Sequence, residues 1–204
     1  MRIISGRARG IRLAVPEDDA IRPTEDKVKG SLFSTLGPLE GAAVLDLFSG
    51  TGALGLEALS RGAARVVMVE RDARHVAVIE RNLAAVLKSM GGTASAGEAV
   101  VVTGEVAGCA ARVSGPFDFV LADPPYHPAA GEYGARELLL DAALARALFT
   151  EGTILALEHA TDVRGLPWAP SSPWRLLKER SFGIRTVSYA RHQSGNPEAS
   201  TKEE

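Results

Sequence analysis

From residue 42 onward, short apolar runs alternate with longer segments whose apolar positions recur every three or four residues. We interpret the short runs as buried strands at 42–48, 64–70, 99–103, 117–122 and 152–158. We interpret the longer segments as helices at 53–62, 73–90, 106–113 and 135–149. Because alternating strands and helices are joined by right-handed crossovers, the pattern predicts an α/β fold with a mostly parallel sheet.

The C-terminal part breaks this alternation. Residues 174–192 contain two β-type runs about a turn near Gly183, with no helical segment between them. The sheet should therefore end in an antiparallel hairpin. The polar residues 193–204 predict a disordered tail. Because the chain shows neither repeats nor a second domain, we expect a single domain over residues 1–192.

Residues 1–40 predict a small extension in front of the alternating region. Two short β-type runs within residues 1–15 favour a β-hairpin. The stretch "RPTEDKVKGSLFSTLG" that follows predicts a helix, with Thr24 as its N-cap and Gly37 and Pro38 as its end.

The composition is that of one soluble domain. At 204 residues the chain can bury a full core, and it has 46% hydrophobic and 24% charged residues. No run of 18 apolar residues indicates a membrane span, and no apolar run follows the N-terminal arginines, so we expect no secretory signal. The single cysteine, Cys109, excludes an internal disulfide and fits a reducing compartment. We therefore expect a cytoplasmic protein.

Positive charge gathers at the N-terminus, although the formal net charge is -2. Four arginines and no acidic residue lie between Met1 and Val15. Arginines in such a segment either protect a sheet edge from pairing or contact the phosphates of a nucleic acid. In the second interpretation, the predicted contacts are Arg7, Arg9, Arg12 and Arg22.

The stretch "DLFSGTGALGLEALSRGA" has Gly50, Gly52 and Gly55 in a GxGxxG arrangement between a predicted strand and a predicted helix. Glycine there permits a tight turn and a close approach of the backbone to a ligand at the carboxyl edge of the sheet. Glu70 ends the next strand, where a carboxylate can accept hydrogen bonds from both ribose hydroxyls. The arrangement predicts a nucleotide-like cofactor.

Two kinds of cofactor fit this pattern. NAD would place a pyrophosphate at the helix N-terminus, whereas S-adenosylmethionine (SAM) has no phosphate and carries an ammonium, a carboxylate and a sulfonium. Asp46 lies within the strand ahead of the glycines. A carboxylate there suits an ammonium and would repel a pyrophosphate, which favours SAM. Glu105 follows the third strand, where we expect the adenine amino group.

The stretch "VLADPPYHP", residues 120–128, ends the fourth predicted strand with an acid, two prolines and an aromatic ring. An exocyclic amine of a nucleobase is a poor nucleophile until its nitrogen becomes tetrahedral, and two hydrogen-bond acceptors favour that geometry. We assign these acceptors to the Asp123 carboxylate and the Pro124 carbonyl, with Pro125 fixing the backbone. Tyr126 would stack on the base.

These stretches, together with "RIISG", "RPTEDKVKGSLFSTL" and "VERD", resemble the RsmD family in order and length over residues 1–192. Members of that family are bacterial enzymes that use SAM to methylate the N2 amine of one guanine in 16S ribosomal RNA. The resemblance implies a Rossmann-like class I methyltransferase fold. It also implies a 16S rRNA substrate, within the 30S subunit or an assembly intermediate.

The resemblance and the motifs together define two predicted sites. The predicted cofactor site comprises Asp46, Phe48, Gly50, Gly52, Glu70, Arg71, Glu105 and Val106. The predicted acceptor site comprises Asp123, Pro124, Pro125 and Tyr126. One departure from the family is Lys29-Gly30-Ser31, where its members usually have Arg-Glu and a small residue. A glycine inside that helix costs about 1 kcal/mol, so we expect it to weaken the helix and any RNA contact made from it.

Two alternative functions stay open. The same D-P-P-Y chemistry serves adenine-N6 or cytosine-N4 methylation of DNA, although this chain lacks room for the large target-recognition domain of such enzymes. A non-catalytic module that binds nucleic acid and senses SAM is the other alternative. The scattered histidines show no ligand spacing, so we predict no metal site. Cys109 lies in a segment of small residues and is interpreted as buried.

Overall fold

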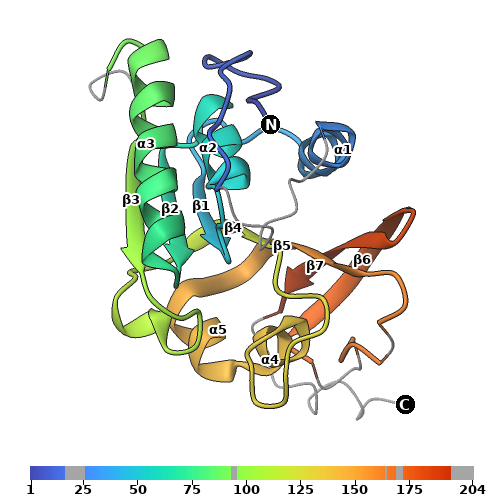
Figure 1. Ribbon diagram of the computed structural model, residues 1–204. Coiled ribbons are helices and arrows are strands. Elements are labelled where there is room, and N and C mark those ends of the chain that lie inside the picture. Colours follow the sequence, from blue (N-terminus) through green and yellow to red (C-terminus); the bar gives the residue numbers. More distant parts are fainter. Residues whose placement is uncertain (17–25, 93–95, 164, 169–171, 194–204) are drawn as a thin grey trace, which may run out of the picture.

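The computed structural model describes residues 1–16, 26–92, 96–163, 165–168 and 172–193 (Figure 1). Its strands are β1 (Ala43–Leu47), β2 (Arg65–Glu70), β3 (Glu98–Thr103), β4 (Phe117–Ala122), β5 (Phe149–Ala160), β6 (Trp174–Phe182) and β7 (Arg185–His192). They form one sheet in the order β3-β2-β1-β4-β5-β7-β6. Neighbours among β1 to β5 pair in parallel, and β7 pairs antiparallel with β5 and β6. The predicted parallel sheet with a C-terminal hairpin is confirmed.

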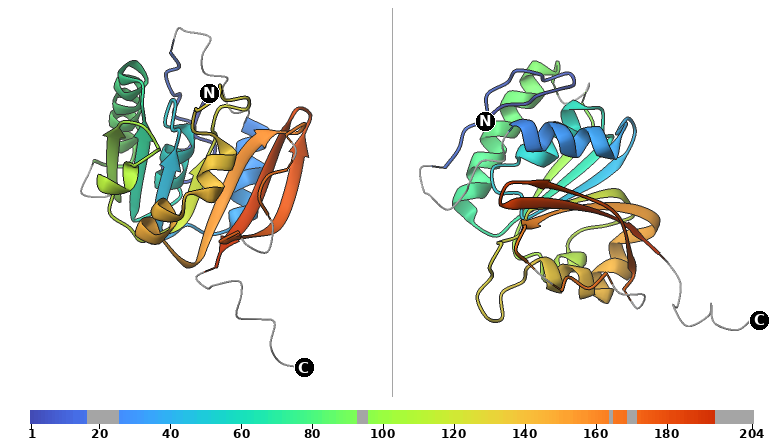
Figure 2. Two further views of the ribbon diagram at one scale, coloured as in Figure 1. Left: turned by 90° about the horizontal axis from the view of Figure 1, so that it is seen from below. Right: turned by 90° about the vertical axis from the view of Figure 1, so that its right-hand side faces the viewer.

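Helices cover both faces of this sheet. They are α1 (Asp26–Leu36), α2 (Ala53–Ser60), α3 (Ala73–Ser89), the 3-10 helix η2 (Cys109–Ala111), α4 (Ala135–Leu140) and α5 (Ala142–Leu148). Figure 2 shows α1, α2 and α3 with the N-terminal segment on one face, and α4 and α5 on the other. Each face has its own buried apolar core. The chain runs outward from β1 to β3 and then returns to β4 beside β1, which makes the β1/β4 boundary a switch point where such sheets bind ligands.

Two helix predictions need correction. The predicted helix 135–149 is interrupted at Asp141, whose carboxylate accepts the Leu144 N–H at 2.8 Å and so caps a new helix, α5. Phe149 already belongs to β5. The predicted helix 106–113 shrinks to the short η2, because Gly108 precedes it in the left-handed conformation with φ 72°.

The N-terminal segment turns back on itself without forming strands. An isolated antiparallel bridge joins Arg2 and Arg12, and the backbone N–H groups of Ile3 and Leu13 donate across the two arms to the carbonyls of Ile11 and Met1 at 2.9 and 3.2 Å. The predicted hairpin is therefore present, but its arms are too short to count as strands. The segment packs on α2, where the Ser60 hydroxyl donates to the Ser5 carbonyl at 2.7 Å. Gly6 has φ 80°, and a Cβ on it would lie 1.9 Å from the Ser60 carbonyl oxygen.

Glu57 of α2 ties this segment to α1. Its carboxylate is fully buried and accepts the backbone N–H groups of Ile4 and Ser5 at 2.8 and 3.0 Å. The ammonium of Lys29, also buried, lies 3.3 Å from the same carboxylate. Helix α1 runs unbroken through Gly30. The departure at Lys29-Gly30-Ser31 therefore leaves the helix intact, and Lys29 makes a core ion pair rather than a surface contact.

Candidate cofactor and acceptor site

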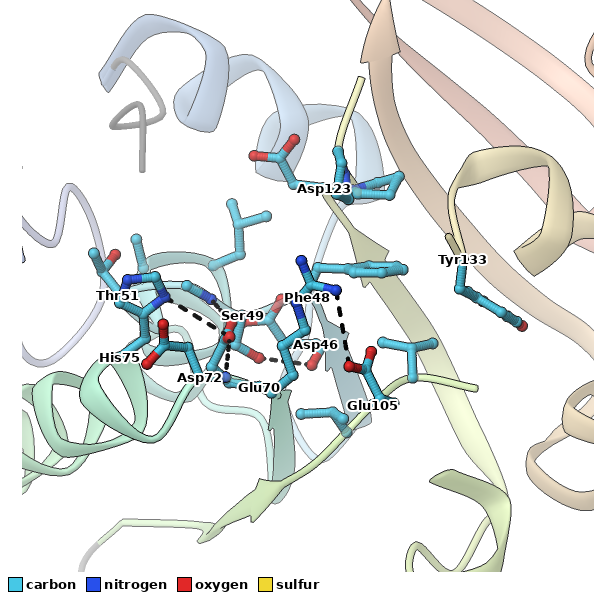
Figure 3. A pocket seen from close by; sticks show the side chains of 18 of the residues that line it. Asp46, Phe48, Ser49, Thr51, Glu70, Asp72, His75, Glu105, Asp123 and Tyr133 are labelled. Atoms are coloured by element: carbon cyan, nitrogen blue, oxygen red, sulfur yellow. Dashed lines mark hydrogen bonds and ion pairs between the residues drawn. The ribbon is translucent and has the colours of Figure 1, made fainter. Parts of the chain in front are cut away.

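A cavity of about 560 Å³ opens at the carboxyl ends of β1, β2 and β4, at the switch point of the sheet. Predicted residues that line it are Asp46, Phe48, Gly50, Glu70, Arg71, Glu105, Val106, Asp123, Pro124, Pro125 and Tyr126. Figure 3 shows Asp123 across this cavity from Glu70 and Glu105. The structure thus brings the two predicted sites into one cavity.

The loop between β1 and α2 is wound tightly over this cavity. Phe48, Gly50 and Gly52 all have positive φ, of 59°, 55° and 76°. Such a conformation is costly for a phenylalanine, and strain of this kind is concentrated at functional sites. The loop is also tied to β2, because the Ser49 N–H donates to the Val69 carbonyl at 3.0 Å.

The three glycines of the motif have their backbone N–H groups engaged within the protein. Gly50 donates to Glu70 Oε2 at 2.8 Å, Gly52 to the Ser49 carbonyl at 2.7 Å, and Gly55 to Asp46 Oδ2 at 2.9 Å. A Cβ on Gly55 would lie 2.7 Å from Met68 Cγ, so glycine there lets α2 pack closely on β2. Gly52 starts α2 and is not among the residues that line the cavity.

The Asp46 side chain is almost completely buried. Its residue exposure is 1%, and burial raises its pKa to about 7, although the hydrogen bond from the Gly55 N–H opposes the shift. The acid is therefore poised to change charge near neutral pH, and an ammonium in the cavity would favour its ionised form.

Glu70 is oriented by two backbone donors. Its Oε1 accepts the Asp72 N–H at 2.9 Å, while its Oε2 accepts the Gly50 N–H. Each carboxylate oxygen has a second lone pair, so Glu70 can still accept two ligand hydroxyls. His75 Nδ1 lies 3.8 Å from Oε1 and also lines the cavity. Nothing in the sequence pattern distinguishes this histidine from the other three in the chain.

Arg71 spans the cavity mouth between two loops. Its guanidinium lies 3.8 Å from Glu105 and 3.7 Å from Glu132, in the loop after β4. All three side chains are substantially exposed, so these ion pairs contribute little to stability. They are placed to hold the loop after β4 near the cofactor side.

The acceptor side consists of the end of β4 and the strands beside it. Burial, and next the negative charge of Glu158, raise the pKa of Asp123 well above its usual value. The Tyr126 hydroxyl donates to Glu158 Oε1 at 2.5 Å, and Arg185 Nη1 lies 3.3 Å from the same oxygen. Arg185 lines the cavity. The sequence analysis missed Glu158 and Arg185, because nothing in the strand patterns marks them.

The predicted RNA contacts lie on the N-terminal segment. Arg9 and Arg12 are exposed. Arg7 is exposed as well, but its Nη2 donates to the Met90 carbonyl at 2.7 Å and so anchors the segment to α3. Met1 of the segment lines the cavity, which places the basic segment next to the site. Arg22 lies outside the described residues.

Cys109 is fully buried, as the sequence predicted. Burial raises the pKa of its thiol to about 11, which makes it a poor nucleophile. Across the described ranges of the chain, no helix is long and apolar enough to cross a membrane.

Comparison with known proteins gives consistent relatives over nearly the full chain. The model of the family described as conserved hypothetical protein 95 matches residues 1–191. Ribosomal RNA small subunit methyltransferase D of Escherichia coli K12 is 33% identical over 98% of this chain and 94% of its own. The protein of that name from Haemophilus influenzae is 32% identical, over 95% and 94%.

Solved structures agree with these relatives. The Escherichia coli protein yhhF has a TM-score of 0.75 and 33% identity, and the match covers 96% of this chain and 99% of that chain. A protein solved in complex with SAH (S-adenosylhomocysteine) has a TM-score of 0.60 at 17% identity, over 81% of this chain and 48% of that one. The second match is a likeness of fold alone.

Proposed function

We propose that this chain methylates the N2 amine of one guanine in 16S rRNA. The chain belongs to the conserved hypothetical protein 95 family, which includes ribosomal RNA small subunit methyltransferase D. The family membership carries the coarser activity, SAM-dependent methylation of small-subunit rRNA. Our proposal adds the base, the atom and the residues that act on them.

The engaged glycines support SAM over a dinucleotide. A pyrophosphate needs free N–H groups at the helix N-terminus, but those of Gly50, Gly52 and Gly55 already have protein acceptors. The acids Asp46 and Glu70 lie at the same place and would repel a phosphate. They suit the ammonium and the ribose hydroxyls of SAM. SAM supplies an electrophilic methyl group on its sulfonium.

The single observation that carries the acceptor assignment is that Asp123, Pro124 and Tyr126 line the same cavity as Asp46 and Glu70. In our proposal the Asp123 carboxyl group accepts a hydrogen bond from one N–H of the target amine, and the Pro124 carbonyl accepts a hydrogen bond from the other. With its raised pKa, Asp123 can take the proton released on methylation. Tyr126 stacks on the base while its hydroxyl stays on Glu158.

The RNA backbone would be held by the basic N-terminal segment. An enzyme that extrudes a base must hold the surrounding phosphates, and exposed Arg9 and Arg12 lie on the segment that reaches the cavity through Met1. We propose 16S rRNA, within the 30S subunit or an assembly intermediate, as the partner, and the cytoplasm as the location.

Methyl transfer from radiolabelled SAM to three substrates tests the proposal. The substrates are 30S particles that lack the modification, naked 16S rRNA and plasmid DNA, each followed by nucleoside analysis. We expect N2-methylguanosine from an RNA substrate. Methylated adenine or cytosine in DNA would support the DNA alternative, and SAM binding without transfer to any substrate would support the non-catalytic one.

A further inference from the structure

Three side chains from neighbouring strands lie together at the acceptor side of the cavity. Ala122 of β4 pairs with Leu157 of β5, so Asp123 and Glu158 are the next residues in register. Ala160 of β5 pairs with Arg185, the first residue of β7. Positions 158 and 160 point to the same face of the sheet. Across the sheet from β4 to β5 to β7, Asp123 and Glu158 therefore present two hydrogen-bond acceptors in succession, followed by the donor Arg185.

The carboxylate of Glu158 has one occupied and one unoccupied oxygen. Oε1 accepts the Tyr126 hydroxyl and faces Arg185 Nη1, as described above. Oε2 is buried and has no hydrogen-bond partner among the described residues. Leaving a charged acceptor unpaired is costly. Glu158 is not among the residues that line the cavity, but Tyr126 and Arg185, which contact its Oε1, are. A base that moves these two side chains apart would reach Oε2 and donate a hydrogen bond to it.

The charge of this group also favours a ligand that donates hydrogens. Of the cations in the described ranges, Arg185 is the one that acts on both Asp123 and Glu158; its side chain is 12% exposed and lines the cavity. Guanine presents the amine N2–H, the ring N1–H and the carbonyl O6 along one edge, which is donor, donor, acceptor. Adenine and cytosine each have a ring-nitrogen lone pair on this edge, which the Glu158 carboxylate would repel.

We propose that Glu158 and Arg185 are specificity-determining residues that read guanine, with Glu158 Oε2 accepting N1–H and Arg185 donating to O6. The inference rests on the proposed guanine-N2 function. Asp123 then acts on the amine, while its two neighbours select the base that carries it. Reading a flipped base along this edge by hydrogen bonds is the usual means of selection.

Changes in the substrate test this without altering the protein. 2-Aminopurine keeps the C2 amine but lacks N1–H and O6, whereas inosine keeps N1–H and O6 but lacks the amine. Each is placed at the mapped target position of the RNA by ligation. We expect kcat/KM for 2-aminopurine to be about 10²-fold or more below that for guanine. We expect the inosine RNA to compete with the guanine RNA better than an adenine RNA does.

Glu158→Gln supplies the matching change in the enzyme. The glutamine oxygen can still accept from Tyr126, but its amide group would meet guanine N1–H donor to donor. We expect kcat/KM for guanine to fall about 10- to 100-fold, while that for 2-aminopurine stays within about 3-fold. Glu179→Gln is the matched control, because the Glu179 carboxylate lies on the edge strand β6 and accepts a hydrogen bond from the Ser188 hydroxyl rather than from Tyr126.

The outcomes separate this inference from the proposed function. If guanine is methylated at N2 but wild-type enzyme methylates 2-aminopurine equally well, the inference is wrong and the function stands. An equal loss for both substrates in Glu158→Gln, with unchanged SAM affinity, would assign Glu158 a merely structural role and also overturn the inference. Absence of any N2-methylguanosine would overturn both.

Discussion

The backbone N–H of Gly50 donates to the carboxylate of Glu70 across 2.8 Å, from the loop after β1 to the end of β2. This bond uses the N–H that a phosphate-binding loop would offer to its ligand. It also fixes the glutamate whose remaining lone pairs face the cavity. One contact thus shapes the loop and orients the acceptor for a ribose.

Glu70→Gln should weaken SAM binding about 10- to 100-fold, because a glutamine cannot accept from both Gly50 and Asp72 and still serve the ribose hydroxyls. Calorimetric titration with SAM measures the effect. Glu80→Gln, an exposed change on α3, is the control. An unchanged Kd would remove Glu70 from the cofactor site.

Asp123→Ala should lower kcat by about 10²- to 10⁴-fold, as expected for a positioned acid-base group, and leave the Kd for SAM nearly unchanged. The reason is that Asp123 lies on the acceptor side of the cavity. Single-turnover rates and SAM titration check the two halves. Loss of SAM binding with normal chemistry would contradict the assignment.

The raised pKa of Asp46 predicts how stability depends on pH. Between its ordinary pKa of 3.8 and its folded pKa of about 7, the folded protein holds a proton that the unfolded chain has lost. The free energy of unfolding should therefore fall as pH rises through this window. Asp46→Asn should remove this pH dependence. The free energy of unfolding of the variant minus that of wild type should therefore be larger at pH 8 than at pH 5.

Urea unfolding of wild type and variant at the two pH values measures this difference. Asp162→Asn, at an exposed position, controls for the loss of one negative charge. A difference between variant and wild type that is the same at both pH values would show that Asp46 is ionised throughout.

Two glycine-to-alanine changes should have opposite effects on stability. Gly6→Ala places a Cβ 1.9 Å from the Ser60 carbonyl oxygen at φ 80°, so we expect a loss of about 2 kcal/mol or more. Gly30→Ala lies within α1, where the nearest atom, Ile4 Cδ1, is 3.5 Å away, so we expect a gain of about 1 kcal/mol. Thermal or urea unfolding decides both signs.

Changing Arg9 and Arg12 to Gln should raise the KM for RNA and reduce the slope of log affinity against log salt by about 0.7 per lost phosphate contact. The Kd for SAM should not change. Arg7 is left intact because it anchors the segment to Met90. The control pair, Arg146→Gln and Arg175→Gln, removes exposed charges from α5 and β6. An equal effect of both pairs would assign the result to net charge alone.

The strands and the cofactor loop could be predicted because their signals are local. Buried parallel strands are continuous apolar runs, and a glycine is required wherever the backbone must turn tightly or pack closely. The break at Asp141 was missed because a capping side chain outweighed the apolar periodicity on either side of it. Glu158 and Arg185 were missed because sheet register alone brings them to Asp123.

The buried carboxylate of Glu57 makes the N-terminal segment inseparable from the rest of the fold. Removing residues 1–14 would strip away the N–H groups of Ile4 and Ser5 and open the Lys29 pair to solvent. A truncated protein would lose stability together with its basic surface, and the two losses would be confounded. Point changes at exposed arginines are therefore the way to separate RNA affinity from folding in this protein.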